Sequence, residues 1–136
     1  MTAANYKWNT YFTYFMLPML YVGCDFHILA ANEVMRELIG YSKEDLLQMN
    51  LTEILVEDIN SQLEQLIFKE QYHSILMKLH LLDKAYNMTS VSACLTNYYS
   101  MEGHFEESLI IFNLLGQDFH SKQGLWNSLM NPSIKN

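Results

Sequence analysis

The chain has 136 residues, of which 50% are hydrophobic and 17% are charged, so it is long enough for one domain with a single core. Its formal charge is -7 with only eight Lys and Arg, which argues against a basic surface for nucleic acid or for an anionic membrane. Cys24 and Cys94 belong to no CxxC pair or Cys/His cluster, so the sequence predicts neither a zinc site nor a disulfide framework.

The first predicted element is an amphipathic helix in residues 1–17. Aromatic side chains recur there at the spacing of one helix face, and a proline ends the pattern. These residues are Trp8, Tyr11, Phe12 and Phe15, followed by Pro18. A stripe this aromatic is unsuited to water, so we expect the helix to cover the outer face of a sheet or a second subunit.

Two short strands are predicted next, at 19–24 and 27–31, joined by a turn at Asp25 and Phe26. In this interpretation Cys24 and Cys94 are small residues within strands. His27, which opens the second strand, has a structural role rather than a ligand role.

A tight corner of two very short helices follows the second strand. Asn32 is suited to cap the first helix, and Gly40 to end it in the left-handed conformation. Ser42 is a second N-cap two residues later. Helices this short need support from a packed face, because nucleation of an isolated helix is unfavourable.

The second half of the chain predicts a longer helix and then three strands. Thr52 is suited to cap a single turn, and 58–71 has the apolar spacing of a helix, with Glu57 and Asp58 at its start. Alternating apolar residues then predict long strands within 74–82, 86–99 and 105–115, and an amphipathic segment predicts a helix in 119–136. On the first of these strands Ile75, Met77, Leu79 and Leu81 face the core, and His80 lies on the surface.

This order of elements resembles the PAS family of sensor domains. The resemblance covers residues 17–118 and depends on Asn32 at the end of the second strand and on the corner Gly40-Tyr41-Ser42. It implies an α+β PAS fold, with a five-stranded antiparallel sheet in the order 2-1-5-4-3 and short helices over one face. The implied division is an N-terminal helix at 1–17, a PAS core at 18–118, and a C-terminal helix and tail at 119–136.

Two stretches depart from the family pattern. Phe26 and His27 follow Asp25 where the family often has a glycine, and Asp118-Phe119-His120 replaces the usual Asp-Ile-Thr ending. In the family, signals pass from the last strand to the helix after it, so the resemblance implies that Asp118 is a relay residue. The alternative is that Asp118 caps the last helix.

The family binds haem, flavins, small metabolites or nothing, and each alternative makes a demand on this sequence. A flavin adduct requires a cysteine in an Asn-Cys-Arg motif on a short helix, and the corresponding stretch, MNLTEIL, has none. Haem needs an axial ligand, for which His73 is the candidate, because its position in the strand pattern places it on the inner side. We therefore leave the cofactor unassigned, with haem disfavoured and no metal site predicted apart from His73.

A small ligand between the sheet and the helices is the remaining possibility. Its candidate lining combines large and small apolar residues, which serve equally well as plain core packing. These residues are Met35, Leu38, Phe68, Met77, Val91, Ala93, Ile110 and Phe112.

We interpret the chain as a sensory and dimerisation domain of a cytoplasmic signalling protein, because it shows no signal peptide pattern and no run of roughly 18 apolar residues. The expected partners are a second copy and an effector such as a histidine kinase, a cyclic-dinucleotide enzyme or a transcription regulator. One alternative is a ligand-free interaction module that uses the N-terminal helix, and another is a haem-based gas or redox sensor. Enzyme activity is not expected, because no combination of base, nucleophile and orienting residue is apparent.

Overall fold

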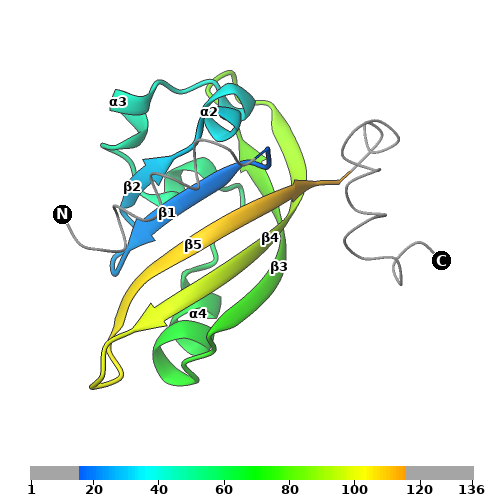
Figure 1. Cartoon of the computed structure of the whole chain (residues 1–136). Coiled ribbons are helices and arrows are strands. Elements are labelled where there is room, and N and C mark those ends of the chain that lie inside the picture. The colour runs from blue at the N-terminus through cyan, green and yellow to red at the C-terminus, as the bar shows by residue number, and fades with distance from the viewer. Residues whose placement is uncertain (1–15, 116–136) are drawn as a thin grey trace.

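The structure is a computed structural model that describes residues 16–115. These residues form a five-stranded antiparallel sheet in the spatial order β2-β1-β5-β4-β3 (Figure 1). The strands are β1 (Met19–Gly23), β2 (Ile28–Ala31), β3 (Ser74–Leu82), β4 (Met88–Tyr99) and β5 (Phe105–Leu114). The sheet order implied by the PAS resemblance is confirmed.

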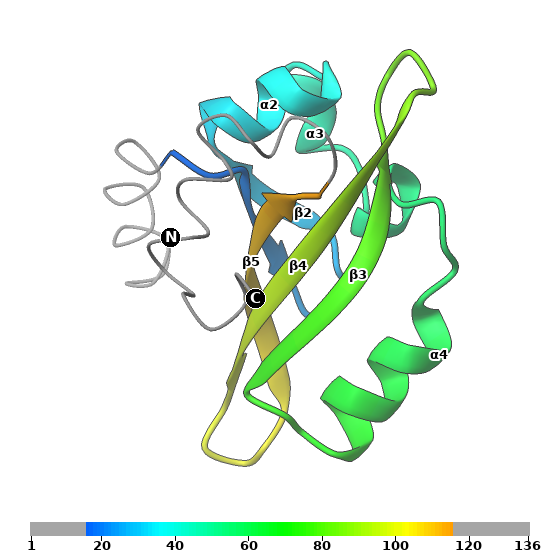
Figure 2. The same ribbon diagram turned by 90° about the vertical axis from the view of Figure 1, so that its right-hand side faces the viewer.

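The helical segments of residues 16–115 cover one side of this sheet, as Figure 2 shows. They are α2 (Glu33–Ile39), α3 (Lys43–Leu46), the 3-10 turn η1 (Leu51–Ile54), α4 (Asn60–Leu63) and the π-helical turn η2 (Glu64–Lys69). We call the side of the sheet under these helices the inner face and the opposite side the outer face. The α+β architecture with short helices over one face is therefore confirmed.

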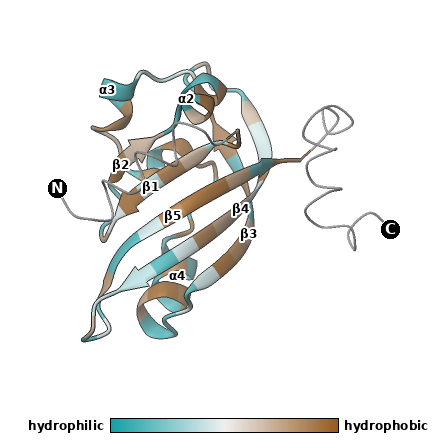
Figure 3. Ribbon diagram, viewed as in Figure 1, coloured by the Kyte–Doolittle hydropathy of each residue, from teal (hydrophilic) through white to brown (hydrophobic). Residues whose placement is uncertain are grey.

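Alternation along the strands assigns side chains to the two faces. On β4, Val91 and Ala93 have no exposed surface, whereas Ser92 and Cys94 between and after them are partly exposed. The inner-face side chains pack with the helices into one large apolar cluster. Figure 3 shows that hydrophobic residues of both faces form a continuous stretch along β5. Each large side chain fully buried in this way stabilises the fold by about 1.5–3 kcal/mol.

Asn32 joins the helices to the sheet. Its side chain is 3% exposed, and its Oδ1 accepts hydrogen bonds from the backbone N–H groups of Met35 (2.9 Å) and Met19 (3.1 Å). Its Nδ2 donates to the carbonyl of Leu17 (2.7 Å). One amide therefore caps α2 and also fixes the start of β1, which is a physical reason for Asn at this position.

The corner after α2 has the geometry expected from the sequence. Gly40 has φ 78° and donates its N–H to the carbonyl of Arg36 (2.8 Å), which ends the helix. Ser42 Oγ accepts from the N–H of Asp45 (3.1 Å) and caps α3. Tyr41 between them is partly buried against the inner-face cluster.

The turn between β1 and β2 differs from the prediction. Cys24 is exposed in the turn rather than part of a strand, and His27 forms an isolated bridge with Asn50 while β2 begins only at Ile28. Phe26 has φ 67°, a conformation that glycine adopts freely and that disfavours other residues by about 1–2 kcal/mol. Its ring is 8% exposed, so burial of the ring offsets the backbone conformation.

The predicted cap at Thr52 is wrong by two residues. Asn50 caps η1, because its side chain accepts from the N–H of Thr52 (3.1 Å) while Glu53 Oε2 accepts from the N–H of Asn50 (2.8 Å). This reciprocal pair satisfies two backbone N–H donors at once. The Thr52 hydroxyl instead donates to Asn50 Oδ1 (3.0 Å).

The predicted helix at 58–71 is shorter and changes its winding. Helical structure begins at Asn60, because Asp58 Oδ1 accepts from the N–H of Asn60 (3.2 Å) and holds the preceding residues in a turn. After α4 the chain widens into the π-helical η2. The expected buried face is nevertheless present, with Ile59, Leu63 and Ile67 each at most 2% exposed.

The predicted terminal helices lie mostly or wholly outside the described residues. Trp8, Tyr11, Phe12 and Phe15 fall in 1–15, and Asp118 falls in 116–136. At the boundary, Met16 and Leu17 are not helical, and Leu17 is 5% exposed.

Candidate functional site

The structure brings most of the predicted lining residues together on the inner face. Five of them are buried in the inner-face cluster, and Leu38 and Met77 are partly buried against it. The five buried residues are Met35, Val91, Ala93, Ile110 and Phe112. Because these side chains contact one another and the helices, this half of the inner face has the packing of a protein core.

The eighth predicted residue, Phe68, lies at the other end of the inner face. Its side chain is 47% exposed, and its ring meets the rings of Phe26 and Phe105 edge-on, with centroids 6.1 Å and 5.6 Å away. Phe26 and Phe105 stack on each other at 5.5 Å, and Tyr99 meets Phe105 at 5.8 Å. We call Phe26, Phe68, Tyr99 and Phe105 the aromatic end.

Two buried polar residues lie side by side near the aromatic end. Asn97 on β4 pairs directly with Ser108 on β5, and their exposed fractions are 2% and 0%. Their positions in the alternation place both on the inner face, in register with Leu95 and Ile110. Apart from Asn32, they are the buried polar residues of the described chain. A small polar group in an apolar wall is typical of ligand sites.

One polar atom of Asn97, the side-chain Oδ1, accepts no hydrogen bond from residues 16–115. Its Nδ2 donates to the carbonyl of Tyr72 (2.8 Å), and its backbone N–H donates to the carbonyl of His73 (2.8 Å). The Oδ1 atom is itself buried. A buried amide oxygen that accepts no hydrogen bond destabilises the fold by about 1–3 kcal/mol. Binding of a group that donates to this oxygen would therefore be favourable.

Ser108 and Tyr99 are already paired. Ser108 Oγ donates to the carbonyl of Thr96 (3.2 Å), and the Tyr99 hydroxyl donates to the carbonyls of Ile67 (2.9 Å) and Tyr72 (3.0 Å). Burial raises the pKa of Tyr99, which keeps the hydroxyl protonated as a donor. Asn97 Oδ1 is therefore the acceptor that remains available at the aromatic end.

Sequence reasoning missed Asn97 and Ser108, although one signal was present. Val91, Ala93 and Leu95 define the inner-face positions of β4, and Asn97 continues the same alternation with a polar side chain. A polar residue in an otherwise apolar series is a sign of a special role.

The residues considered for cofactors lie elsewhere. His73 has an exposed side chain just before β3, and its ring packs edge-on against Tyr99 at 5.2 Å. Cys24 is exposed, and Cys94 lies on the outer face of β4. Residues 16–115 contain no group of three or more His, Cys, Asp and Glu side chains placed to hold a metal ion.

Glu57 and His80 form a pair that the sequence did not indicate. Glu57 Oε1 accepts from the backbone N–H of His80 (2.9 Å), and Oε2 lies 2.5 Å from the ring Nδ1. Burial raises the pKa of the Glu57 carboxyl, but its hydrogen bonds with His80 and with its own backbone, together with the electrostatic interaction with His80, lower the pKa by more, so it is below its usual value. Glu57 thus ties the segment before α4 to edge strand β3, rather than serving the helix N-terminus as predicted.

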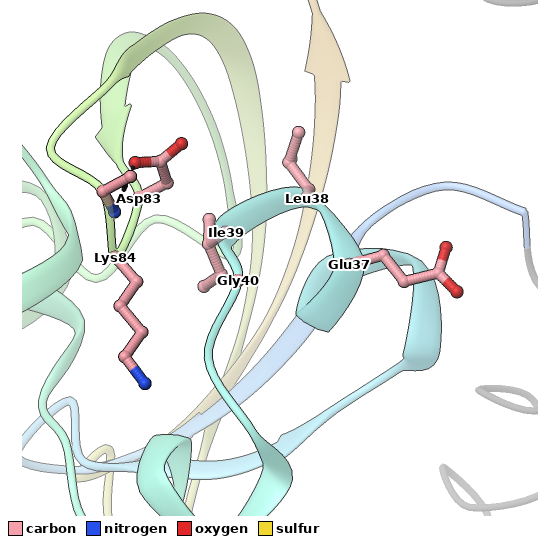
Figure 4. Close-up of a pocket in the computed structure, with 7 residues that line it drawn as sticks. Glu37, Leu38, Ile39, Gly40, Asp83 and Lys84 are labelled. Carbon is pink, nitrogen blue, oxygen red and sulfur yellow. Dashed lines mark hydrogen bonds between the residues drawn. The ribbon is translucent and has the colours of Figure 1, made fainter.

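An open hollow of about 340 Å³ lies between the end of α2 and the β3–β4 turn (Figure 4). Its charged side chains, Glu37, Asp83 and Lys84, point in different directions rather than toward one point. Lys84 lies 3.9 Å from Asp45 and 5.9 Å from the centre of the Tyr41 ring, while its N–H bonds the carbonyl of Ile39 (2.9 Å). These contacts fasten the turn to the corner at Gly40.

Comparison of the sequence with protein-family models and with curated proteins gives no match. Solved structures that resemble the chain include several PAS domains. The PAS domain of a two-component sensor histidine kinase is 20% identical, with a TM-score of 0.65 over 85% of this chain and 100% of that one.

Two further solved structures extend the likeness to other protein classes. The PAS domain of the fruit-fly ELK potassium channel is 12% identical, with a TM-score of 0.66 over 86% of this chain and all of that one. A variant of RsLOV is 14% identical, with a TM-score of 0.73 over 98% of this chain and 80% of that one. At these identities the likeness is one of fold, and the fold of residues 16–115 is the PAS fold.

Proposed function

We propose that this chain, whose fold is that of PAS domains from sensor kinases and other signalling proteins, is a sensory and dimerisation domain of a cytoplasmic signal-transduction protein. It binds a small, mostly apolar ligand on the inner face and relays the bound state through its terminal segments to an effector. The proposal includes no enzymatic step, and its expected partners are a second copy of the chain and an effector.

The buried Oδ1 of Asn97 is the observation that supports a ligand most directly. The atom is buried and accepts no hydrogen bond within residues 16–115. Asn97 follows Val91, Ala93 and Leu95 in the inner-face alternation of β4, and the next inner-face pair is Tyr99 and Phe105. A ligand that fits is largely apolar and offers one N–H or O–H donor. Phe68 is the exposed side chain of the aromatic end, so the ligand enters by displacing its ring.

The relay follows from where the strands end. β1 and β5 are neighbours, and the pairing of Met19 with Ile111 places the start of β1 beside the end of β5. Both terminal segments, including Asp118 in the second, continue from this end of the sheet. A ligand that shifts β5 therefore acts on both connections to an effector, of which a histidine kinase is one class, as in the first of the solved structures.

The test is mass spectrometry of the freshly purified chain, first native and then denaturing, together with a visible absorption spectrum. We expect a non-covalent mass that is lost on denaturation. A Soret band after haem supplementation would instead favour a haem sensor, and its absence would end that alternative.

Two matched variants locate the ligand. Asn97→Leu keeps a similar volume but removes the amide, and Asn113→Leu makes the same change on β5 at a partly exposed position across from Ser92. We expect the extra mass to disappear from the first variant and to persist in the second. Loss from both, or from neither, would contradict the role of Asn97.

The second candidate function is a ligand-free interaction module. It is favoured by the packing of Val91, Ala93 and Phe112, which have no exposed surface and are in contact with the same inner-face cluster. A chain with no extra mass, together with a dimer in sedimentation equilibrium, would support this function over the sensor.

A further inference from the structure

The outer face of the sheet presents an apolar surface that the described residues do not cover. Met19 and Tyr21 on β1 are each 1% exposed, and Leu109 on β5 is 6% exposed. Ala30, Tyr98 and Ile111 are partly buried against them. We call these six residues the outer cluster. The helices of residues 16–115 all lie on the opposite side of the sheet (Figure 2).

Cross-strand contacts within one sheet do not bury such side chains to this extent. Neighbouring strands lie about 4.8 Å apart, so side chains on one face touch sideways while their ends point away from the sheet. On β3 the outer-face residue Leu76 shows this default, because 72% of its side chain is exposed. The outer cluster therefore has a cover that Leu76 lacks.

We propose that residues 1–15 of the same chain cover the outer cluster, with Trp8, Tyr11, Phe12 and Phe15 packed against β1 and β5. The segment ends at Phe15, four residues before Met19, the first residue of β1. In helical form its stripe from Trp8 to Phe15 is about 10 Å long, which equals the width of three adjacent strands. An aromatic stripe and the largely apolar outer cluster, which includes the rings of Tyr21 and Tyr98, are complementary in chemistry.

The short connection favours the chain's own segment over that of a second copy. Met16, Leu17 and Pro18 are the three residues that separate Phe15 from β1. Leu17 is buried, and the carbonyl of Pro18 accepts from the N–H of Phe112 (3.0 Å), so the connection is fixed on the sheet. Attachment this close gives a high effective concentration, which a second copy matches only at high protein concentration.

The inference does not depend on a ligand at Asn97, because the outer cluster lies on the other side of the sheet. It does decide between the two roles expected for the N-terminal segment, a sheet cover or a subunit interface. The segment then lies on β5 itself, whose opposite side contains Ile110 and Phe112.

The experiment uses the full chain and its two tryptophans, Trp8 and Trp126. In Trp126→Phe the fluorescence reports Trp8 alone. We expect blue-shifted emission and protection from acrylamide that do not change with protein concentration, and that are equal in samples that sedimentation shows to be monomeric or dimeric. Emission typical of water, or protection that appears only as dimer forms, would overturn the proposal.

Matched substitutions on the outer face then locate the contact. Leu109→Lys in the Trp126→Phe background should shift the Trp8 emission to the red, whereas Leu76→Lys should not. Ile111→Lys, at a partly buried position in the outer cluster, replaces Leu109→Lys if circular dichroism shows that the latter is unfolded. An unchanged Trp8 in a folded outer-cluster variant, or a response of Trp126 in Trp8→Phe instead, would overturn the assignment.

Discussion

The two faces of the sheet differ in how their burial is achieved. On the inner face, Val91 and Phe112 are buried by helices of the described chain, and their places could be predicted from alternation. On the outer face, Met19 and Tyr21 are buried to the same extent with no helix of residues 16–115 above them. Burial on the inner face is thus explained by the helices of residues 16–115. Burial on the outer face requires a covering element outside these residues, which we propose is the segment 1–15.

The comparison also separates possible roles. The inner face has the buried polar pair Asn97 and Ser108, and it is the face on which we propose a small ligand. The outer cluster is apolar and is suited to a helix or another chain. β5 contributes to both faces, with Ile110 and Phe112 on the inner face and Leu109 and Ile111 in the outer cluster.

The largest expected effect is on the inner face. Phe112→Ala removes a ring with no exposed surface, so the free energy of unfolding should fall by about 3–5 kcal/mol. Ile111→Ala, the next residue on β5, changes the partly buried outer side and should lower it by no more than about 2 kcal/mol. Urea denaturation of both variants checks the difference, and equal losses would contradict the division between the faces.

Asn32 tests whether the helices are held to the sheet by a polar tie as well as by packing. Asn32→Ala leaves two backbone donors and one carbonyl without their side-chain partner and should lower stability by about 2–4 kcal/mol. Asn32→Asp keeps the acceptor for Met19 and Met35 but loses the donor to Leu17, so thermal denaturation should give a smaller loss. If both variants resembled the wild type, the tie would be dispensable.

Gly40 tests the corner that positions α2 and α3 over the inner face. Because Gly40 has φ 78°, Gly40→Ala should lower stability by about 1–2 kcal/mol. The control is Gly23→Ala at the end of β1, where φ is not positive and an added Cβ would lie 3.6 Å from the Leu29 side chain. We expect little change there in the urea midpoint, and an equal shift at both glycines would rule out a conformational cause.

The smallest effect is expected for the pair of Glu57 and His80 at the sheet edge. Since the pKa of Glu57 is lower in the folded chain than its usual 4.5, its contribution is present above that pH and is lost as the pH falls through the lowered value. Both side chains are more than a third exposed, so Glu57→Gln should reduce stability by less than about 1 kcal/mol near neutral pH. The difference from wild type should shrink in acid. The control Glu64→Gln removes an exposed pair with Lys69 (3.8 Å).

The sheet and the corner helices were predictable because they follow local rules. Alternation along β3, β4 and β5 gave the inner face, and capping chemistry gave the ends of α2 at Asn32 and Gly40. Seven of the eight lining residues met in or against one cluster for the same reason. Phe68 in η2 lies at the other end of the inner face and is 47% exposed.

The candidate site was less predictable because it depends on contacts between distant segments. Phe26 adopts a left-handed conformation so that its ring reaches Phe105, and no periodic pattern indicates this. Asn97 lacks a donor for its Oδ1 because of what surrounds it in three dimensions. The bond of Glu57 with His80 replaces the local helix role that the sequence favoured, because the partner is 23 residues away.

The account of two differently covered faces is tested most directly by a pair of double-mutant cycles in the full chain. Phe12→Ala is combined with Met19→Ala on the outer face and, separately, with Leu20→Ala, its buried neighbour on the inner face of β1. The account predicts a coupling of about 0.5–3 kcal/mol between Phe12 and Met19 and additive effects for Phe12 and Leu20. Additive effects in both cycles, measured by urea denaturation, would contradict it.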